Sequence, residues 1–88
     1  MEPGKYYLFA CPFFWTFVGE YVRDLNFQKI IVRNAGYFTR TGATFDILCS
    51  KGFQRETAFV DCSALGEMPI PSQGPWFPWL AKTPWVKK

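Results

Sequence analysis

The feature that most constrains the fold is a succession of short aromatic and β-branched runs, each ended by a proline, a glycine or a turn-forming residue. Such runs are typical of strands. Five of them are predicted to be strands: Lys5–Cys11, Thr16–Arg23, Lys29–Ala35, Glu56–Val60 and Glu67–Ile70. The third strand has room to extend through residues 36–40. The pattern indicates a mainly β chain whose first three strands form a meander of hairpins.

One short helix is expected in the insert before the fourth strand. Thr44 is a candidate N-cap, and the helix would run through Cys49 with Phe45 and Leu48 on one side. Gly19, in the middle of the second strand, indicates a sharp bend or a close approach of two backbones. Five short, bent strands around an apolar interior predict a small SH3-like barrel that is strongly bent.

The last part of the chain reads differently. Proline is too frequent after Pro69 for a central strand, so we divide the chain into a barrel domain over residues 1–74 and a tail over residues 75–88. The tail carries four large rings: Trp76, Phe77, Trp79 and Trp85. Left in water they would form an apolar patch. We therefore expect the tail to pack on the barrel or on a neighbouring subunit.

The residue types exclude most catalytic chemistry. The chain has no histidine, which removes Ser–His–Asp and Cys–His arrangements and zinc sites that need imidazole. No two of the acidic residues form an acid/base pattern. The three cysteines, Cys11, Cys49 and Cys62, are widely spaced and odd in number, which favours a reducing compartment. We expect no enzyme activity, no metal and no cofactor.

A membrane location is not expected. The most apolar stretch, Tyr6–Val18, is interrupted by Pro12, and it is shorter than the roughly 20 residues of a transmembrane helix. The start of the chain lacks the basic residues and the small-residue cleavage site of a secretion signal. These features favour the cytoplasm.

The net charge of +3 is modest, and the basic residues concentrate in the middle of the chain. Residues 23–55 hold six basic and two acidic side chains, a net +4. This balance is compatible with nucleic-acid binding and with an ordinary solvated face. Arg40, Lys51 and Arg55 are therefore either surface charges or a peripheral RNA track.

Residues 18–35 resemble the first Sm motif of the Sm-like proteins, the family that includes the bacterial RNA chaperone Hfq. The matching positions are Gly19, Tyr21, Phe27, Ile30, Val32 and Ala35. Asp24 stands one place early, and Lys29 stands where the family has asparagine. The resemblance covers about half the chain, whose layout is similar to the small Sm-like proteins of cyanophage.

The second Sm motif is matched less fully. Thr57–Val60 fits its strand, but the usual Arg-Gly pair falls on Asp61 and Cys62. The resemblance implies a five-stranded Sm-like barrel whose open edges pair between copies to form a ring of five to seven subunits. It also implies binding of uridine- or adenosine-rich single-stranded RNA, in the role of a chaperone or post-transcriptional regulator.

The resemblance also assigns roles to residues. Phe27 would stack on a base, Asn26 would read a base edge, and Lys29 would contact a phosphate or a base. Asp24 would order the turn by accepting backbone N–H bonds. Asp61 and Cys62 would occupy the second side of the site, where the carboxylate disfavours phosphate. The alternative function is an SH3-like protein-interaction or virion structural module that binds no RNA.

Overall fold

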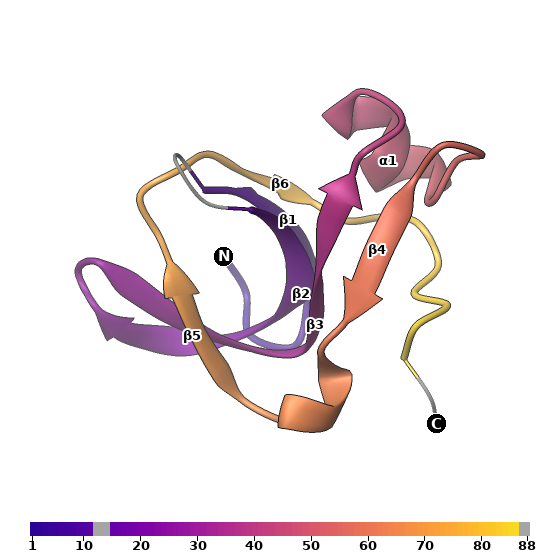
Figure 1. The fold of residues 1–88 in the computed structure, drawn as a ribbon. Coiled ribbons are helices and arrows are strands. Elements are labelled where there is room, and N and C mark those ends of the chain that lie inside the picture. Colours follow the sequence, from indigo (N-terminus) through magenta and orange to yellow (C-terminus); the bar gives the residue numbers. More distant parts are fainter. Residues whose placement is uncertain (12–14, 87–88) are drawn as a thin grey trace.

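The computed structural model describes residues 1–11 and 15–86 (Figure 1). The elements in chain order are β1 (Tyr6–Ala10), β2 (Thr16–Asn26), β3 (Lys29–Arg40), α1 (Phe45–Lys51), β4 (Ala58–Asp61), the 3-10 helix η1 (Ser63–Leu65), β5 (Met68–Pro71) and β6 (Trp76–Pro78). The prediction of a mainly β chain with a short helix before the fourth strand is confirmed. Pro12 and the last two residues of the tail lie outside the described residues.

The strands form one antiparallel sheet in the order β4-β3-β2-β1-β6. The long strand β3 has two partners on the same edge. Its first half, Lys29–Val32, pairs with β5, and its second half pairs with β4 from Gly36 onward. Between the two halves, Asn34 takes a φ of +49°, in the left-handed region that few non-glycine residues adopt. The bend at this point separates the two partners of β3.

The expected five-stranded barrel differs from the structure in two respects: over residues 1–11 and 15–86 the sheet has six strands, and it is not closed. The sixth strand, β6, lies in the proline-rich tail and pairs with β1. In the described residues no pairing joins β4 to β6, the two ends of the strand order. Side chains of α1 and of the tail pack between them: the Phe59 and Trp85 rings are 5.0 Å apart, and the Phe45 and Phe77 rings 5.8 Å.

The close backbone approach predicted at Gly19 is confirmed. A Cβ atom placed there would lie 2.6 Å from the Cβ of Ala35, so only glycine fits. The β2–β3 register shifts at this point, between Val18 and Glu20. The Glu20 carboxylate accepts hydrogen bonds from Arg33 Nε at 2.8 Å and Asn34 Nδ2 at 3.2 Å. These side-chain hydrogen bonds join β2 to β3 and hold the bend of the two strands.

The core has two parts, one on each face of the sheet. Inside the bend lie mainly side chains of β1, β2 and β3: Tyr7, Phe9, Cys11, Phe17, Tyr21, Ile30, Val32, Ala35 and Ile70. On the outer face, α1 and the tail cover a second group: Leu8, Val18, Phe38, Leu48, Cys49, Trp79 and Trp85. Strand β1 is therefore buried on both faces, which its apolar residues on both faces predict.

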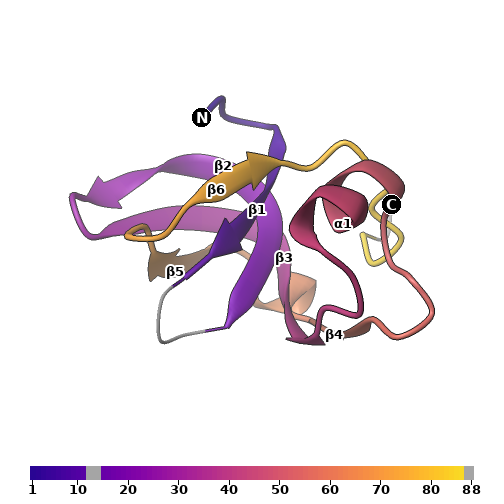
Figure 2. The same cartoon turned by 90° about the horizontal axis from the view of Figure 1, so that it is seen from above.

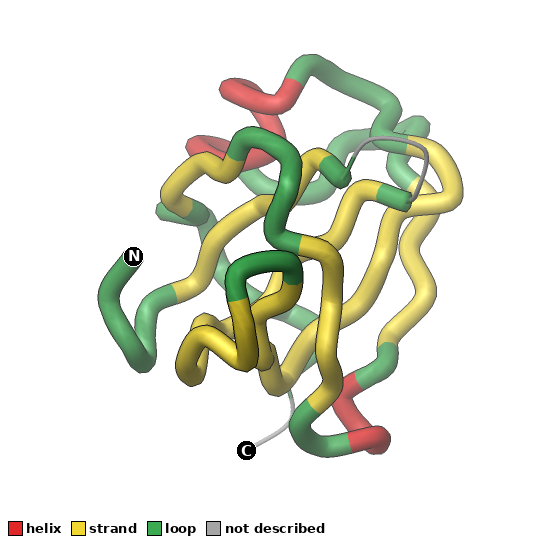
Figure 3. The backbone as a smooth tube through the Cα atoms, turned by 90° about the vertical axis from the view of Figure 1, so that its left-hand side faces the viewer, coloured by secondary structure: helices red, strands yellow, loops and turns green. Residues whose placement is uncertain are grey.

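Two further views place the elements. The β2–β3 turn extends from one end of the molecule and α1 lies at the other (Figure 2). Viewed from the side of that turn, the strands curl around a common interior (Figure 3). Over residues 1–11 and 15–86, no helix is long and apolar enough to cross a membrane.

Candidate nucleic-acid interface

The β2–β3 turn holds an aromatic ring in solvent. Strand β2 ends at Asn26 and β3 begins at Lys29, which leaves Phe27 and Gln28 as the turn. Asn26 Oδ1 accepts hydrogen bonds from the backbone N–H of Gln28 at 2.8 Å and of Lys29 at 3.0 Å. An asparagine side chain that bonds its own backbone in this way fixes a turn. Phe27 projects from it with 89% of its surface exposed.

The two cations near the Phe27 ring differ in whether they form an ion pair. Arg23 donates to Glu67 at 2.9 Å in an exposed ion pair. Lys29 is exposed and takes part in none of the ion pairs found in the described part of the chain. Leu25, on the other side of the turn, is also exposed. The turn thus offers an aromatic face, an aliphatic side chain and a cation.

Asp24 has a different partner from the one that we expected. Its carboxylate accepts a hydrogen bond from the Tyr21 hydroxyl at 2.8 Å. This bond raises the pKa of the Tyr21 hydroxyl, because the protonated form is the donor. The backbone N–H groups of the turn bond to Asn26 instead. The structure therefore gives Asn26 the role of ordering the turn.

The structure does not bring Asp61 and Cys62 beside the turn. Asp61 pairs with Gly36, in the second half of β3, and the Cys62 N–H donates to the Ala35 carbonyl at 2.8 Å. Asp61 Oδ1 accepts from the Ser63 N–H at 2.8 Å, at the start of η1. Burial raises the pKa of the Cys62 thiol, and the Asp61 charge adds to this effect. The Asp61 carboxylate and the Cys62 backbone therefore hold the junction between β4 and η1.

The segment beside the turn is instead the loop between β5 and β6. Lys29 pairs with Pro71, and the Ser72 N–H donates to the Gln28 carbonyl at 3.0 Å. The loop then crosses to β1, where the Pro75 carbonyl accepts from the Ala10 N–H at 3.0 Å. Sequence reasoning missed this loop. Its signal was a Ser-Gln-Gly stretch enclosed by two prolines, which is typical of a loop.

The three peripheral candidates lie away from the turn. Arg40 ends β3 and forms an exposed ion pair with Glu56 at 3.6 Å. Lys51 ends α1, at the opposite end of the molecule from the turn (Figure 2). Arg55 is exposed in the segment that follows the helix. These cations do not extend the site at the turn.

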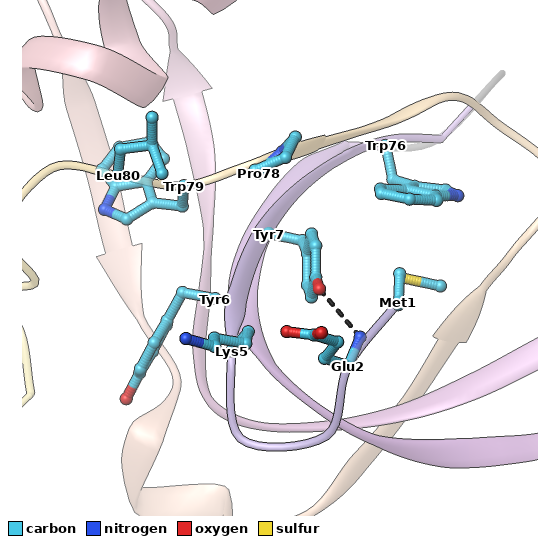
Figure 4. Close-up of a pocket in the computed structure, with 9 residues that line it drawn as sticks. All are labelled: Met1, Glu2, Lys5, Tyr6, Tyr7, Trp76, Pro78, Trp79 and Leu80. Carbon is cyan, nitrogen blue, oxygen red and sulfur yellow. Dashed lines mark hydrogen bonds between the residues drawn. The ribbon is translucent and has the colours of Figure 1, made fainter.

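A mainly apolar cavity of about 370 Å³ lies between the N-terminal residues and β6 (Figure 4). The Trp76 ring meets the Tyr7 ring edge-on, with centroids 5.3 Å apart. The Tyr7 hydroxyl accepts a hydrogen bond from the Glu2 N–H at 2.8 Å. The cavity thus lies between the N-terminal segment and the edge strand β6, and aromatic side chains form part of its wall.

Both ends of the strand order expose apolar side chains. On the β4 side, Trp15 is 57% exposed and stacks on Tyr37 with centroids 4.0 Å apart, while Val60 of β4 pairs with Tyr37. On the β6 side, Trp76 and Phe77 are partly exposed. We expected the four tail rings to pack on the barrel or on a neighbouring subunit, and in the single chain they divide into two pairs. Trp79 and Trp85 are buried, and the other two are not.

The arrangement offers binding chemistry. Among residues 1–11 and 15–86, no three Cys, Asp or Glu side chains gather to hold a metal ion. Burial raises the pKa of the Cys11 and Cys49 thiols to about 11, which keeps both protonated at neutral pH. Comparison of the chain with known protein families, with curated proteins and with solved structures finds no match.

Proposed function

We propose that the protein binds single-stranded RNA through the β2–β3 turn, as a homo-oligomeric ring of Sm-like subunits. The observation that carries the proposal is the Phe27 ring, 89% exposed on a turn that Asn26 holds in place. Stacking of a base on an aromatic side chain contributes about 1–3 kcal/mol and tolerates any base. A fixed turn reduces the ordering cost of binding.

The residues around the Phe27 side chain would supply the remaining contacts to the RNA. Lys29 would contact a phosphate. Ser72 and Gln73, on the loop that bonds to Gln28, would take the place on the second side of the site that Asp61 and Cys62 do not occupy. Asn26 uses its Oδ1 within the turn, so its Nδ2 would donate to a base edge. Uridine and adenosine both offer acceptors to such a donor.

The open edges support a ring. β4 and β6 end the strand order, and each edge carries exposed apolar side chains. Unpaired edges invite pairing with another chain. Because the two edges differ, pairing of β4 with β6 of the next copy is heterologous, and it forms a ring when the rotation between copies closes. A ring of five to seven turns would bind one RNA strand at several sites, as a chaperone or regulator needs.

A second candidate function is a protein-interaction or virion structural module. The exposed Trp15–Tyr37 stack favours it, because aromatic residues are enriched at protein interfaces. In that case the edges would bind a different protein, and the turn would make no nucleic-acid contact.

Titration with oligouridine, oligoadenosine and oligocytidine at two salt concentrations tests the proposal, together with the sedimentation mass. We expect a mass several times 10.2 kDa, and binding that weakens with salt but persists at the higher concentration. A 10.2 kDa species that binds none of the three would contradict the proposed function. A ring without RNA binding would favour the protein-interaction module.

A further inference from the structure

A groove of about 500 Å³ lies between the end of α1 and the C-terminal segment. The elements that enclose it, the end of α1 and the C-terminal segment, lie at the other end of the molecule from the β2–β3 turn (Figure 2). Residues on both sides line it, among them Lys51 and Phe53 from the helix side and Leu80 and Lys82 from the tail. None of the contacts at the turn reaches it.

The two walls of the groove are bonded to each other. The backbone N–H groups of Leu80 and Ala81 both donate to the Cys49 carbonyl, at 2.8 and 2.9 Å. Trp79 Nε1 donates to the Lys82 carbonyl at 3.3 Å, from a ring that is buried in the outer part of the core. The groove is therefore preformed, and a ligand would not need to order its walls.

Two of the residues that line the groove, Phe53 and Leu80, are large and apolar. The Phe53 ring stacks on Trp85 with centroids 5.4 Å apart and planes at 13°, so its orientation is fixed. Leu80, the second apolar residue of the lining, is 79% exposed. An aromatic ring and an aliphatic side chain at one opening provide a surface for a flat apolar group such as a base.

The charge of the groove has one sign. Its charged lining residues are Lys51 and Lys82, and neither takes part in an ion pair among residues 1–11 and 15–86. The nearest acid on α1, Asp46, accepts a hydrogen bond from the Thr44 hydroxyl, which lowers the pKa of the carboxyl. The Cys49 carbonyl at the helix end already accepts two N–H groups. An anion would therefore meet two cations.

We propose that this groove binds one nucleotide unit of a single-stranded RNA. The base lies against Phe53 and Leu80, and the flanking phosphates contact Lys51 and Lys82. The two lysines favour a polyanion over an apolar peptide. The Phe53 ring favours a nucleic acid over a simple polyphosphate, which has no base to stack on it. The inference rests on the proposed RNA-binding function and adds a contact remote from Phe27.

The test compares the double variant Lys51→Gln/Lys82→Gln with Lys5→Gln, a charge control on the N-terminal segment. Both receive oligouridine over a range of salt concentrations. The double variant should bind about 2- to 30-fold more weakly, the effect of two exposed ion pairs. Its slope of log affinity against log salt should fall by about 1.4, or 0.7 for each phosphate. The control should keep the parent affinity and slope.

Photocrosslinking of a thiouridine-containing oligomer gives a second readout, and attachment to residues 52–55 supports the groove. Parent-like affinity and slope in the double variant overturn the groove, while a loss in Phe27→Ala leaves the turn in place as the site. Competition by polyphosphate as effective as by oligouridine overturns the role of Phe53. A parent protein that binds no RNA overturns both proposals.

Discussion

At the scale of single residues, Asn26 decides the shape of the turn that presents Phe27. One side-chain oxygen accepts two backbone N–H groups, which would otherwise depend on water. The Phe27 ring contributes little to this arrangement because it is almost wholly exposed. Turn stability and ring exposure therefore belong to different residues, and variants can separate them.

Asn26→Ala removes the acceptor of both bonds. We expect the free energy of unfolding to fall by about 1–3 kcal/mol, because each of the two hydrogen bonds contributes about 0.5–1.5 kcal/mol net. Asn26→Asp keeps an acceptor oxygen and should retain most of the stability. Urea denaturation of the two variants and the parent checks this. Equal losses in both variants would show that the side-chain oxygen does not hold the turn.

The turn itself could be predicted from the sequence, but the segment that lies beside it could not. Phe27 lies in the gap between the predicted strands, residues 24–28, and the structure narrows the turn to Phe27 and Gln28 because β2 runs on past the expected Arg23 to Asn26. The position of Asp61 and Cys62 depends on where the chain after β4 goes. It forms η1 and then returns along the first half of β3 as β5, so Ser72 rather than Asp61 reaches the turn. That path is set by long-range pairing, which no local pattern encodes.

At the scale of elements, β3 organises the molecule because β2, β4 and β5 all pair with it. Its contact with β4 is unusually close at Gly36. A Cβ atom there would lie 2.2 Å from the Phe59 ring and 2.4 Å from the Val60 carbonyl oxygen. The Phe59 ring and the β4 backbone can both lie this close to β3 only because Gly36 has no side chain.

Gly36→Ala should therefore destabilise the protein strongly, by about 3 kcal/mol, the upper end of what overpacking ordinarily costs. Gly4→Ala is a useful contrast, because nothing lies within 4 Å of its Cβ position and only its φ of +87° resists alanine. That strain costs about 1–2 kcal/mol. Thermal denaturation compares the two, and a smaller effect at Gly36 would contradict the β3–β4 packing.

The helix and the first three strands are local enough to be predicted, and β6 is not. α1 begins after Thr44, as expected, but the Thr44 side chain makes no cap hydrogen bond, and the helix runs on from the expected Cys49 to Lys51, before Gly52. β6 follows Pro75 and ends on Pro78, in a segment with too many prolines for a central strand. It forms all the same at an edge, where a missing N–H faces solvent and costs little. Whether an edge is free is a property of the assembled sheet.

At the scale of the whole molecule, the tail completes the outer half of the core. Trp79 and Trp85 pack over the β sheet together with Leu48 of α1. Trp85 Nε1 also donates to the Asn34 carbonyl at 2.8 Å, at the bend of β3. One tail residue thus connects the outer core to the strained residue that separates the two partners of β3.

Trp85→Ala should lower the free energy of unfolding by about 3–5 kcal/mol, as the loss of a buried ring does. Trp85→Phe keeps most of the packing but leaves the Asn34 carbonyl without its donor, at a cost of about 1–3 kcal/mol. Trp15→Ala, at an exposed stack, should cost only about 0.5–1.5 kcal/mol. Chemical denaturation ranks the three, and a parent-like Trp85→Ala protein would show that the tail is not part of the core.

The central claim is that Phe27 on its turn binds single-stranded RNA, and a titration of four proteins with oligouridine tests it most directly. Phe27→Ala should bind about 1–3 kcal/mol more weakly than the parent. Phe27→Trp should bind as well or better, because indole also stacks. Leu65→Ala, which removes another exposed apolar side chain, should match the parent. Equal affinities of the parent and Phe27→Ala for RNA, with the fold intact in both, would contradict the claim.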